Sequence, residues 1–174
     1  RDGRPVYQKA VGWADKEANR RMTTDTIFRI ASQTKAITSV GILVLVEEGK
    51  IGINDPVSRF IPAYAKTTVA VTKPDGNLEI VPAKRAITVT DLMTHTAGFC
   101  YDVWNGDMGK YQEKTGTPNI FSCQNAALKG PIMSDPGTRW EYGINIDFVG
   151  KAVEAASGKR LDAYLRDHMF APLG

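Results

Sequence analysis

The stretch SQTKAITSVGILVLVEEG, residues 32–49, decides how the rest of the chain is interpreted. From about Thr34 to Gly49 its apolar residues follow helical spacing and widen until the apolar face nearly encircles the helix. This pattern predicts a helix that is buried on most sides, and Gly49 is a typical C-terminal stop. The helix opens on Ser32-Gln33-Thr34-Lys35, a Ser-x-x-Lys tetrapeptide.

Ser32 and Lys35 are candidate catalytic residues because positions i and i+3 share one face of a helix. A Ser hydroxyl becomes a good nucleophile only when a neighbour accepts its proton. Burial against apolar surface disfavours the ammonium form of a Lys, so Lys35 could serve as that base. The alternative is structural: Ser32 would cap the helix and Lys35 would be solvated. The tetrapeptide alone favours this alternative, since it occurs by chance roughly once per few hundred residues.

The composition describes an ordinary globular chain. It has 174 residues, 43% of them hydrophobic, and a net charge of +3, which excludes a disordered chain, a coiled coil and a collagen-like fibre. Lys and Arg are scattered and no long apolar run occurs, so we expect no nucleic-acid partner, no membrane partner and no transmembrane helix. The chain opens on Arg1 with no charged-then-apolar leader, so no targeting segment is visible in it, and the compartment, cytoplasmic or periplasmic, stays open.

Cysteine and histidine are scarce. Cys100 and Cys123 are the two cysteines, which excludes a disulfide scaffold and leaves one bridge or two free thiols open. With two histidines in addition, the chain offers little material for a zinc site.

Hydrophobic periodicity and turn residues predict the other secondary structure. We expect a strand over 5–13, a short strand or extended segment over 27–30, and a hairpin of 67–72 and 78–81. Short helices are expected over 57–61 and from 88, with Thr90 near the N-cap of the second, and longer helices over about 144–157 and 161–169. The stretch 99–139 is expected to be irregular, with one short helix.

Tyr142 and His95 are further candidates. Tyr142 precedes a predicted helix and could act as general base if cationic groups lower its pKa, and Asn145 three residues on could share its face. The alternative for Tyr142 is a core tyrosine. His95 is interpreted as a structural histidine that ties a loop to the backbone, and His168 as a surface or packing residue.

Four sets of motifs in a fixed order give the chain a resemblance to serine β-lactamase-related proteins. They are Phe28–Lys35 with Val46–Ile51 and Asp55–Val57, then Ile87–Gly98, which is similar to an LLTHTSG segment, then Pro136–Gly143 with Asp147 and Gly150, and finally Phe170–Gly174. The chain most resembles family VIII carboxylesterases and the acyltransferase of the lovastatin pathway.

The resemblance implies an α/β (α+β) fold, a β-lactamase/transpeptidase-like antiparallel sheet flanked by helices plus a helical region. It implies that Ser32 is the nucleophile that forms an acyl-enzyme, that Lys35 is its partner, and that Tyr142 is the general base, its phenolate stabilised by Lys35. The backbone N–H of Ser32 would supply half of the oxyanion hole. No metal and no organic cofactor is implied.

Two departures from the family pattern shape the expected function. The middle motif of β-lactamases is Tyr-x-Asn or Ser-x-Asn, whereas here Ile144 stands third and Asn145 fourth, which favours an esterase-like site. The later Lys-Thr-Gly or His-x-Gly motif, which supplies the second oxyanion N–H, has no copy after Tyr142. We therefore expect residues 1–174 to be the N-terminal or central part of one catalytic domain.

The expected function is a serine hydrolase, most simply a carboxylesterase acting on short acyl esters. A β-lactamase or D-Ala-D-Ala peptidase is the alternative enzyme, and a non-catalytic fragment or binding domain is the alternative of another class. The expected partners are a small-molecule ester or acyl substrate and either the missing C-terminal half or a second chain. Aromatic residues of the irregular stretch are candidates for lining the acyl pocket: Tyr101, Trp104, Tyr111 and Phe121.

Overall fold

The computed structural model describes every residue from Arg1 to Gly174. The chain divides into two compact units, Arg1–Gln33 and Thr34–Gly174. The longest helix, α1 (Gln33–Glu47), has 15 residues, and no helix is long and apolar enough to cross a bilayer. No group of three or more His, Cys, Asp and Glu side chains gathers in a way that could hold a metal ion.

The first unit contains one short antiparallel pair of strands, β1 (Trp13–Asp15) and β2 (Arg20–Arg21). The guanidinium carbon of Arg21 lies 3.8 Å from the centre of the Trp13 ring. The strand predicted over residues 5–13 is wrong except at Trp13, because residues 5–12 pair with no other strand and an isolated strand leaves its backbone groups unbonded. Residues 27–30 also belong to no strand.

Helix α1 confirms the helix predicted over residues 34–49, and Gly49 follows it with a left-handed φ of 72°. The predicted burial on most sides is wrong, since Val40 and Leu43 are 47% and 42% exposed. Burial is confined to the stripe that faces other helices of the second unit: Thr38, Gly41, Ile42 and Leu45.

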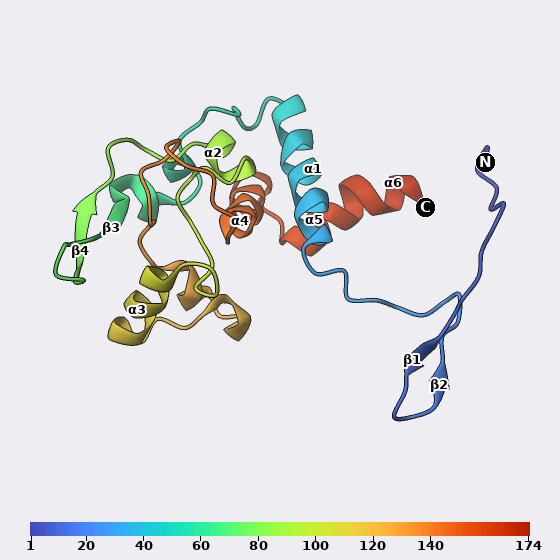
Figure 1. Cartoon of the computed structure of the whole chain (residues 1–174). Helices are drawn as coiled ribbons and strands as arrows, with labels where there is room; N and C mark the ends of the chain where they lie inside the picture. The colour runs from blue at the N-terminus through green and yellow to red at the C-terminus, as the bar shows by residue number, and fades with distance from the viewer. The chain divides into compact units, whose positions relative to one another are not determined.

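A close approach of two helices explains the glycine in that stripe. A Cβ atom built on Gly41 would lie 2.8 Å from Cδ2 of Leu165, which belongs to α5 (Leu161–Leu165). The bare backbone at Gly41 therefore lets α5 pack against α1, as seen in Figure 1.

The hairpin was predicted correctly. Strands β3 (Thr68–Thr72) and β4 (Leu78–Pro82) pair antiparallel in a regular register from Thr68 opposite Pro82 to Thr72 opposite Leu78. Gly76 supplies the left-handed residue of the turn, with φ of 81°. The other side of β3 meets residue 132, since Ala70 N–H donates to the Ile132 carbonyl at 2.8 Å.

The helices predicted over 57–61, from 88, over about 144–157 and over 161–169 are all present close to these ranges. Two short helices with 3₁₀ geometry, η1 and η2, stand near residues 57–66, and the stretch 99–139 is less irregular than expected because it contains a ten-residue helix. The helices are η1 (Val57–Arg59), η2 (Pro62–Lys66), α2 (Val89–Met93), α3 (Gly106–Thr115), η3 (Ile120–Ser122), η4 (Asn125–Leu128), α4 (Asn145–Ser157), and α5, which continues through a π-helical turn (Arg166–Phe170) into α6 (Ala171–Leu173).

The core of the second unit centres on three aromatic rings. Phe99 and Phe148 stack with ring centres 4.2 Å apart, and Tyr64 meets both edge-on. The Tyr64 hydroxyl donates to the Leu128 carbonyl at 2.6 Å, so its one polar atom is paired inside the apolar cluster. Phe148 belongs to α4, so the cluster packs that helix against Tyr64 of η2 and Phe99 of the loop after α2.

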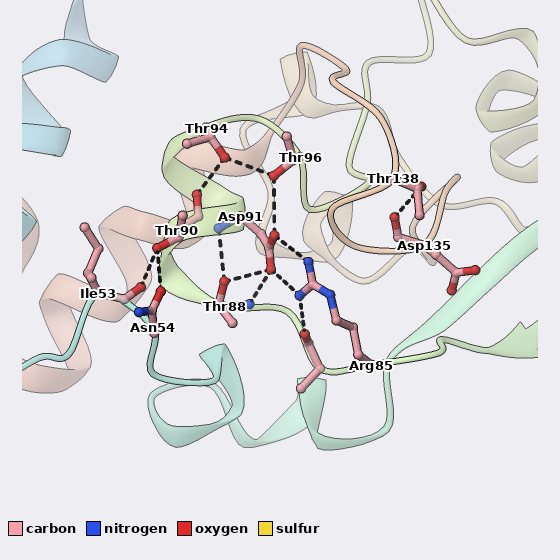
Figure 2. Close-up of polar contacts among 11 residues, drawn as sticks. Ile53, Asn54, Arg85, Thr88, Thr90, Asp91, Thr94, Thr96, Asp135 and Thr138 are labelled. Atoms are coloured by element: carbon pink, nitrogen blue, oxygen red, sulfur yellow. Dashed lines mark hydrogen bonds and ion pairs between the residues drawn. The ribbon is translucent and has the colours of Figure 1, made fainter.

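The carboxylate of Asp91 organises α2 and the loop after it (Figure 2). Its oxygens accept two hydrogen bonds from Arg85, at 2.6 and 2.8 Å, and two from Thr88, from the backbone N–H at 2.9 Å and the hydroxyl at 2.8 Å. The Thr96 hydroxyl adds a longer contact at 3.4 Å. Burial by itself would raise the pKa of Asp91, but these donors outweigh it and hold the pKa below its ordinary value.

The N-cap of α2 is Thr88, and Thr90 lies two residues after it, near the N-cap as predicted. Asp91 is the third helical residue, and its carboxylate accepts a hydrogen bond from the Thr88 backbone N–H while the Thr88 hydroxyl accepts one from the Asp91 N–H. This reciprocal pair is a capping box with Thr88 as the N-cap. The Thr90 hydroxyl instead bonds the Ile53 carbonyl and Asn54 (Figure 2).

We predict that Asp91→Asn lowers the free energy of unfolding by about 2–4 kcal/mol, since it leaves Arg85 without its carboxylate and removes one capping bond. The pKa of Asp91 is lower in the folded than in the unfolded state. Its ionised carboxylate therefore stabilises the fold at pH values above the unfolded-state pKa, and this stabilisation is lost as the pH falls through the folded-state pKa. Urea unfolding at several pH values measures both effects.

Asp107→Asn is the matched control. Asp107 also bonds a threonine and a basic residue, Thr72 and Lys110, but at an exposed site. Its loss is expected to cost at most about 1 kcal/mol. Equal losses for the two variants would contradict the central role given to Asp91.

Candidate active site

Lys35 lies in the first turn of α1 and meets two tyrosines that are distant in the chain. Its Nζ donates to the Tyr101 hydroxyl at 3.1 Å. It also hydrogen-bonds the Tyr142 hydroxyl and lies 4.8 Å from the centre of the Tyr142 ring. The structure thus brings together two of the three predicted site residues, Lys35 and Tyr142.

The charge of Lys35 differs from the sequence-based expectation. Burial by itself would lower the pKa of Lys35, as expected, but the hydrogen bonds to the hydroxyls of Tyr101 and Tyr142 outweigh burial and raise the pKa above its ordinary value. Lys35 is therefore an ammonium ion at neutral pH. Its chemistry here is that of a fixed cation beside two phenols.

Tyr142 is held by the segment that precedes α4, so the prediction that it lies just before a helix is confirmed. The backbone N–H of Glu141 donates to the carbonyl of His95 at 2.9 Å. On the other side, a Cβ atom on Gly143 would lie 2.5 Å from the Cα of Cys100. Only glycine permits this contact between the two backbones, and the contact fixes where Tyr142 projects.

Four aromatic rings surround Tyr142. The ring-centre distances are 4.8 Å to His95, 5.6 Å to Trp104, 5.7 Å to Tyr101 and 6.3 Å to Trp140. Trp104 and Trp140 are also 68% and 65% exposed, so they form the outer part of this aromatic cluster.

Ser32 belongs to the first unit and is the residue directly before α1. Residues 30–33 form a turn in which the Gln33 N–H donates to the Ile30 carbonyl at 3.1 Å. Ala31, inside the turn, has a φ of +43°, a conformation that costs free energy for a residue with a Cβ atom. Ser32 is exposed and lies three residues before Lys35 in the chain.

Asn145 does not extend the Lys35 site. It is fully buried, and its amide nitrogen lies near His95 Nδ1, the Phe99 carbonyl and the Glu141 carbonyl, at 3.0, 3.3 and 3.4 Å. Asn145 thereby ties the start of α4 to the two segments that flank Tyr142. This internal role could not be separated from a catalytic one by spacing alone.

The two histidines have different surroundings. His95 contacts Tyr142 and Asn145 with its side chain, so it does more than tie a loop to the backbone. Burial, and then the positive charge of Lys35, lower the pKa of His95. His168 stacks on Tyr164 at 4.3 Å, in agreement with the predicted packing role.

Both cysteines are free thiols, which decides the alternative left open by the sequence. Burial raises the pKa of Cys100 to about 12, with the charge of Glu141 acting in the same direction. Cys100 therefore carries no thiolate at neutral pH and is not a nucleophile. Its role is packing against Gly143.

Sequence reasoning missed two residues near Lys35. Tyr101 was expected to line a pocket, whereas it accepts a hydrogen bond from Lys35 across 66 residues of chain. Asp147 lies in the first turn of α4; burial raises its pKa, and the charge of Lys35 opposes that effect. Asp147 could have been recognised from the sequence because it belongs to the motif that contains Tyr142. No sequence spacing indicated that Tyr101 would contact Lys35.

The four aromatic pocket candidates fall into two groups. Tyr101 and Trp104 lie beside Tyr142. Tyr111 lines a separate groove of about 270 Å³ next to the hairpin, and Phe121 is 72% exposed in η3.

Comparison with known proteins gives a consistent result. The sequence profile of the family described as Beta-lactamase matches residues 1–174. The chain is 32% identical over 182 residues to "Esterase EstB" of Burkholderia gladioli, which covers 100% of this chain and 43% of the esterase. It is 34% identical over 156 residues to "Monacolin J acid methylbutanoyltransferase" of Aspergillus terreus, covering 88% of this chain and 38% of that enzyme.

Solved structures give the same picture. Unliganded simvastatin synthase (LovD) from Aspergillus terreus superposes with a TM-score of 0.80 at 30% identity, over 95% of this chain and 42% of that one. EstCE1, described as a hydrolase with promiscuous acyltransferase activity, gives 0.78 at 27% identity, over 100% of this chain and 45% of that one. The chain thus spans about two-fifths of the length of these relatives.

We predict that Gly143→Ala destabilises the protein by about 1–3 kcal/mol or more, because the new methyl group meets backbone atoms of Cys100 that cannot move aside. The intrinsic fluorescence of the aromatic cluster should change with it. Thermal unfolding and tryptophan emission measure the two effects.

Gly109→Ala in α3 is the control, since a Cβ atom there meets nothing within 4 Å. Alanine favours a helix, so this variant should be neutral or stabilised by up to about 1 kcal/mol. A Gly143→Ala protein as stable as Gly109→Ala would show that the backbone contact does not constrain Tyr142.

Proposed function

The chain belongs to the Beta-lactamase family, and on that premise we propose that the whole protein is a serine hydrolase or acyltransferase that works through an acyl-Ser32 intermediate. The predicted β-lactamase/transpeptidase-like fold is confirmed by the family match and by the superposition on simvastatin synthase. The relatives include both an esterase and acyltransferases, and esters of small acyl groups are the substrates we propose.

The observation that carries this proposal is the Lys35 ammonium bonded to the hydroxyls of Tyr101 and Tyr142. A cation at hydrogen-bonding distance favours the phenolate form of a tyrosine. A Tyr142 phenolate is a suitable general base for a serine hydroxyl, and Lys35 would stabilise it without exchanging its own proton.

In the proposed reaction, Ser32 Oγ attacks the ester carbonyl carbon while its proton passes to Tyr142. The tetrapeptide begins a helix, whose free N–H groups and dipole stabilise negative charge that develops there. The C–O bond to the alcohol then breaks, the alcohol takes the proton from Tyr142, and acyl-Ser32 remains. Water, or a second alcohol, attacks the acyl-serine by the same steps in reverse.

Hydrolysis and acyl transfer share this first half and differ only in the acceptor of the acyl group. Carboxylesterase activity is the simplest form, since water is always present. Acyl transfer to an alcohol is the second form, and it is supported by the methylbutanoyltransferases among the relatives.

We predict that p-nitrophenyl acetate acylates the full-length protein on Ser32, seen as a p-nitrophenol burst and as an acetylated peptide by mass spectrometry. Ser32→Ala should abolish the burst, and Tyr142→Phe should slow acylation by about 10²–10⁴-fold through the loss of the base. Ser39→Ala and Tyr111→Phe serve as matched controls and should retain the burst. Acylation that persists in Ser32→Ala would refute the proposal.

A second experiment separates the esterase from the β-lactamase alternative. We expect hydrolysis of p-nitrophenyl esters to be faster, by about tenfold or more in kcat/KM, than opening of a chromogenic cephalosporin, because Asn145, the asparagine nearest the family's third position, is turned into the core. A cephalosporin that opens faster than the ester would favour the β-lactamase. Failure of both reactions in the full-length protein would favour a non-catalytic binding domain.

A further inference from the structure

His95 has the left-handed backbone conformation that a glycine adopts after helices α1, α3 and α4. Each of these helices is followed by a left-handed glycine, Gly49, Gly116 or Gly158, with φ near +70°, and a Cβ atom there would meet nothing within 4 Å. Helix α2 ends at Met93 with Thr94 as its C-cap, and the left-handed residue that follows is His95, with φ of +57°. A residue with a Cβ atom costs free energy in this conformation, so the imidazole itself requires an explanation.

The backbone at His95 is fixed from both directions. The next residue, Thr96, donates its N–H to the Asp91 carbonyl at 2.8 Å, and the His95 carbonyl accepts from Glu141 N–H at 2.9 Å. The Asp91 cluster in Figure 2 therefore sets where the His95 side chain begins. The second bond connects His95 to the residue that precedes Tyr142.

Asn145 determines which nitrogen of His95 carries the proton. The Phe99 and Glu141 carbonyls near the Asn145 amide can only accept hydrogen bonds, so the group that faces them is the NH₂. The same NH₂ lies 3.0 Å from His95 Nδ1. Nδ1 must then accept, and the proton of the neutral imidazole is on Nε2.

A doubly protonated His95 would place two donors face to face at Asn145. The charged groups around the imidazole either disfavour its protonation or are paired with other residues. The positive charge of Lys35 disfavours a second positive charge on His95. Of the nearby carboxylates, Asp91 is bonded to Arg85, and Glu141 is bonded to Asn105 and ion-paired with Arg139. Burial likewise lowers the pKa of His95.

The neutral imidazole lies against the ring of Tyr142. The ring centres are 4.8 Å apart with planes tilted by 40°, and Trp140 meets His95 edge-on at 6.1 Å. The Tyr142 ring thus has an imidazole and the Lys35 ammonium as close neighbours, at 4.8 Å each. A neutral ring supports Tyr142 without adding a second cation beside its hydroxyl.

We propose that His95 is a positioning residue of the acyl-transfer site, a neutral Nε2–H imidazole fixed by Asn145 that holds the ring of Tyr142 against Lys35. This inference rests on the proposed function of Tyr142 as the general base. It predicts a specific protonation state of the resting protein and a specific kinetic defect when the imidazole is removed.

The first test measures the protonation state of His95 in the wild-type full-length protein. Imidazole nitrogen chemical shifts, measured by NMR between pH 6 and pH 8, should show His95 as the Nε2–H tautomer with Nδ1 unprotonated. The His95 signals are assigned by their absence in His95→Asn. An Nδ1–H tautomer or an imidazolium at pH 7 would overturn the proposal.

The second test measures acylation of Ser32 by p-nitrophenyl acetate. His95→Asn keeps a residue that tolerates a left-handed backbone but removes the ring. We expect the acylation rate constant to fall about tenfold or more with KM changed by less than about twofold, and the pH at which acylation becomes half-maximal to rise. His168→Asn, which removes the imidazole stacked on Tyr164, should match the wild type.

The outcomes separate this inference from the proposed function. A wild-type protein that forms acyl-Ser32 together with a folded His95→Asn variant of the same rate and pH profile would refute the role of His95 alone. A wild-type protein that never acylates Ser32 would refute the proposed function, while the NMR experiment would still decide the tautomer.

Discussion

The second unit depends on one buried carboxylate, that of Asp91. Its partners come from the chain before α2, from the N-cap of α2 and from the loop after it, namely Arg85, Thr88 and Thr96. A carboxylate that is desolvated to this degree is tolerated only when donors surround it, so all three segments must adopt one arrangement together. That arrangement sets the direction of the loop at His95, and His95 in turn bonds the residue before Tyr142.

The elements that were predictable from the sequence are those whose stabilising contacts lie close along the chain. Helix α4 ends at Gly158 and the β3–β4 hairpin turns at Gly76 because glycine adopts a left-handed conformation at little cost. The strand expected over residues 5–13 rested on a loose alternation of apolar residues, but a strand also requires a partner, and only Trp13 pairs with one. The local sequence pattern was therefore enough to predict elements whose backbone hydrogen bonds form within the element itself.

The arrangement of the candidate site shows the same limit more sharply. Motif order placed Lys35 and Tyr142 in one site, and their contact is observed, but the bond between Lys35 and Tyr101 spans 66 residues and leaves no spacing signal. The protonation of Lys35 was not predictable for a related reason. Burial and the hydroxyl oxygens that accept from Nζ act on the pKa of Lys35 with opposite sign, and only the three-dimensional distances decide that the hydroxyls prevail.

The Lys35 result also bears on why esterases and acyltransferases occur among the relatives. In the proposed mechanism a cationic Lys35 keeps its proton in both half-reactions, and Tyr142 alone receives and returns one. Such a base does not distinguish water from an alcohol, since each delivers its proton to the same phenolate. On this proposal the choice of acceptor comes from the residues around Tyr142, among them Trp104 and Trp140, and not from the proton-transfer groups.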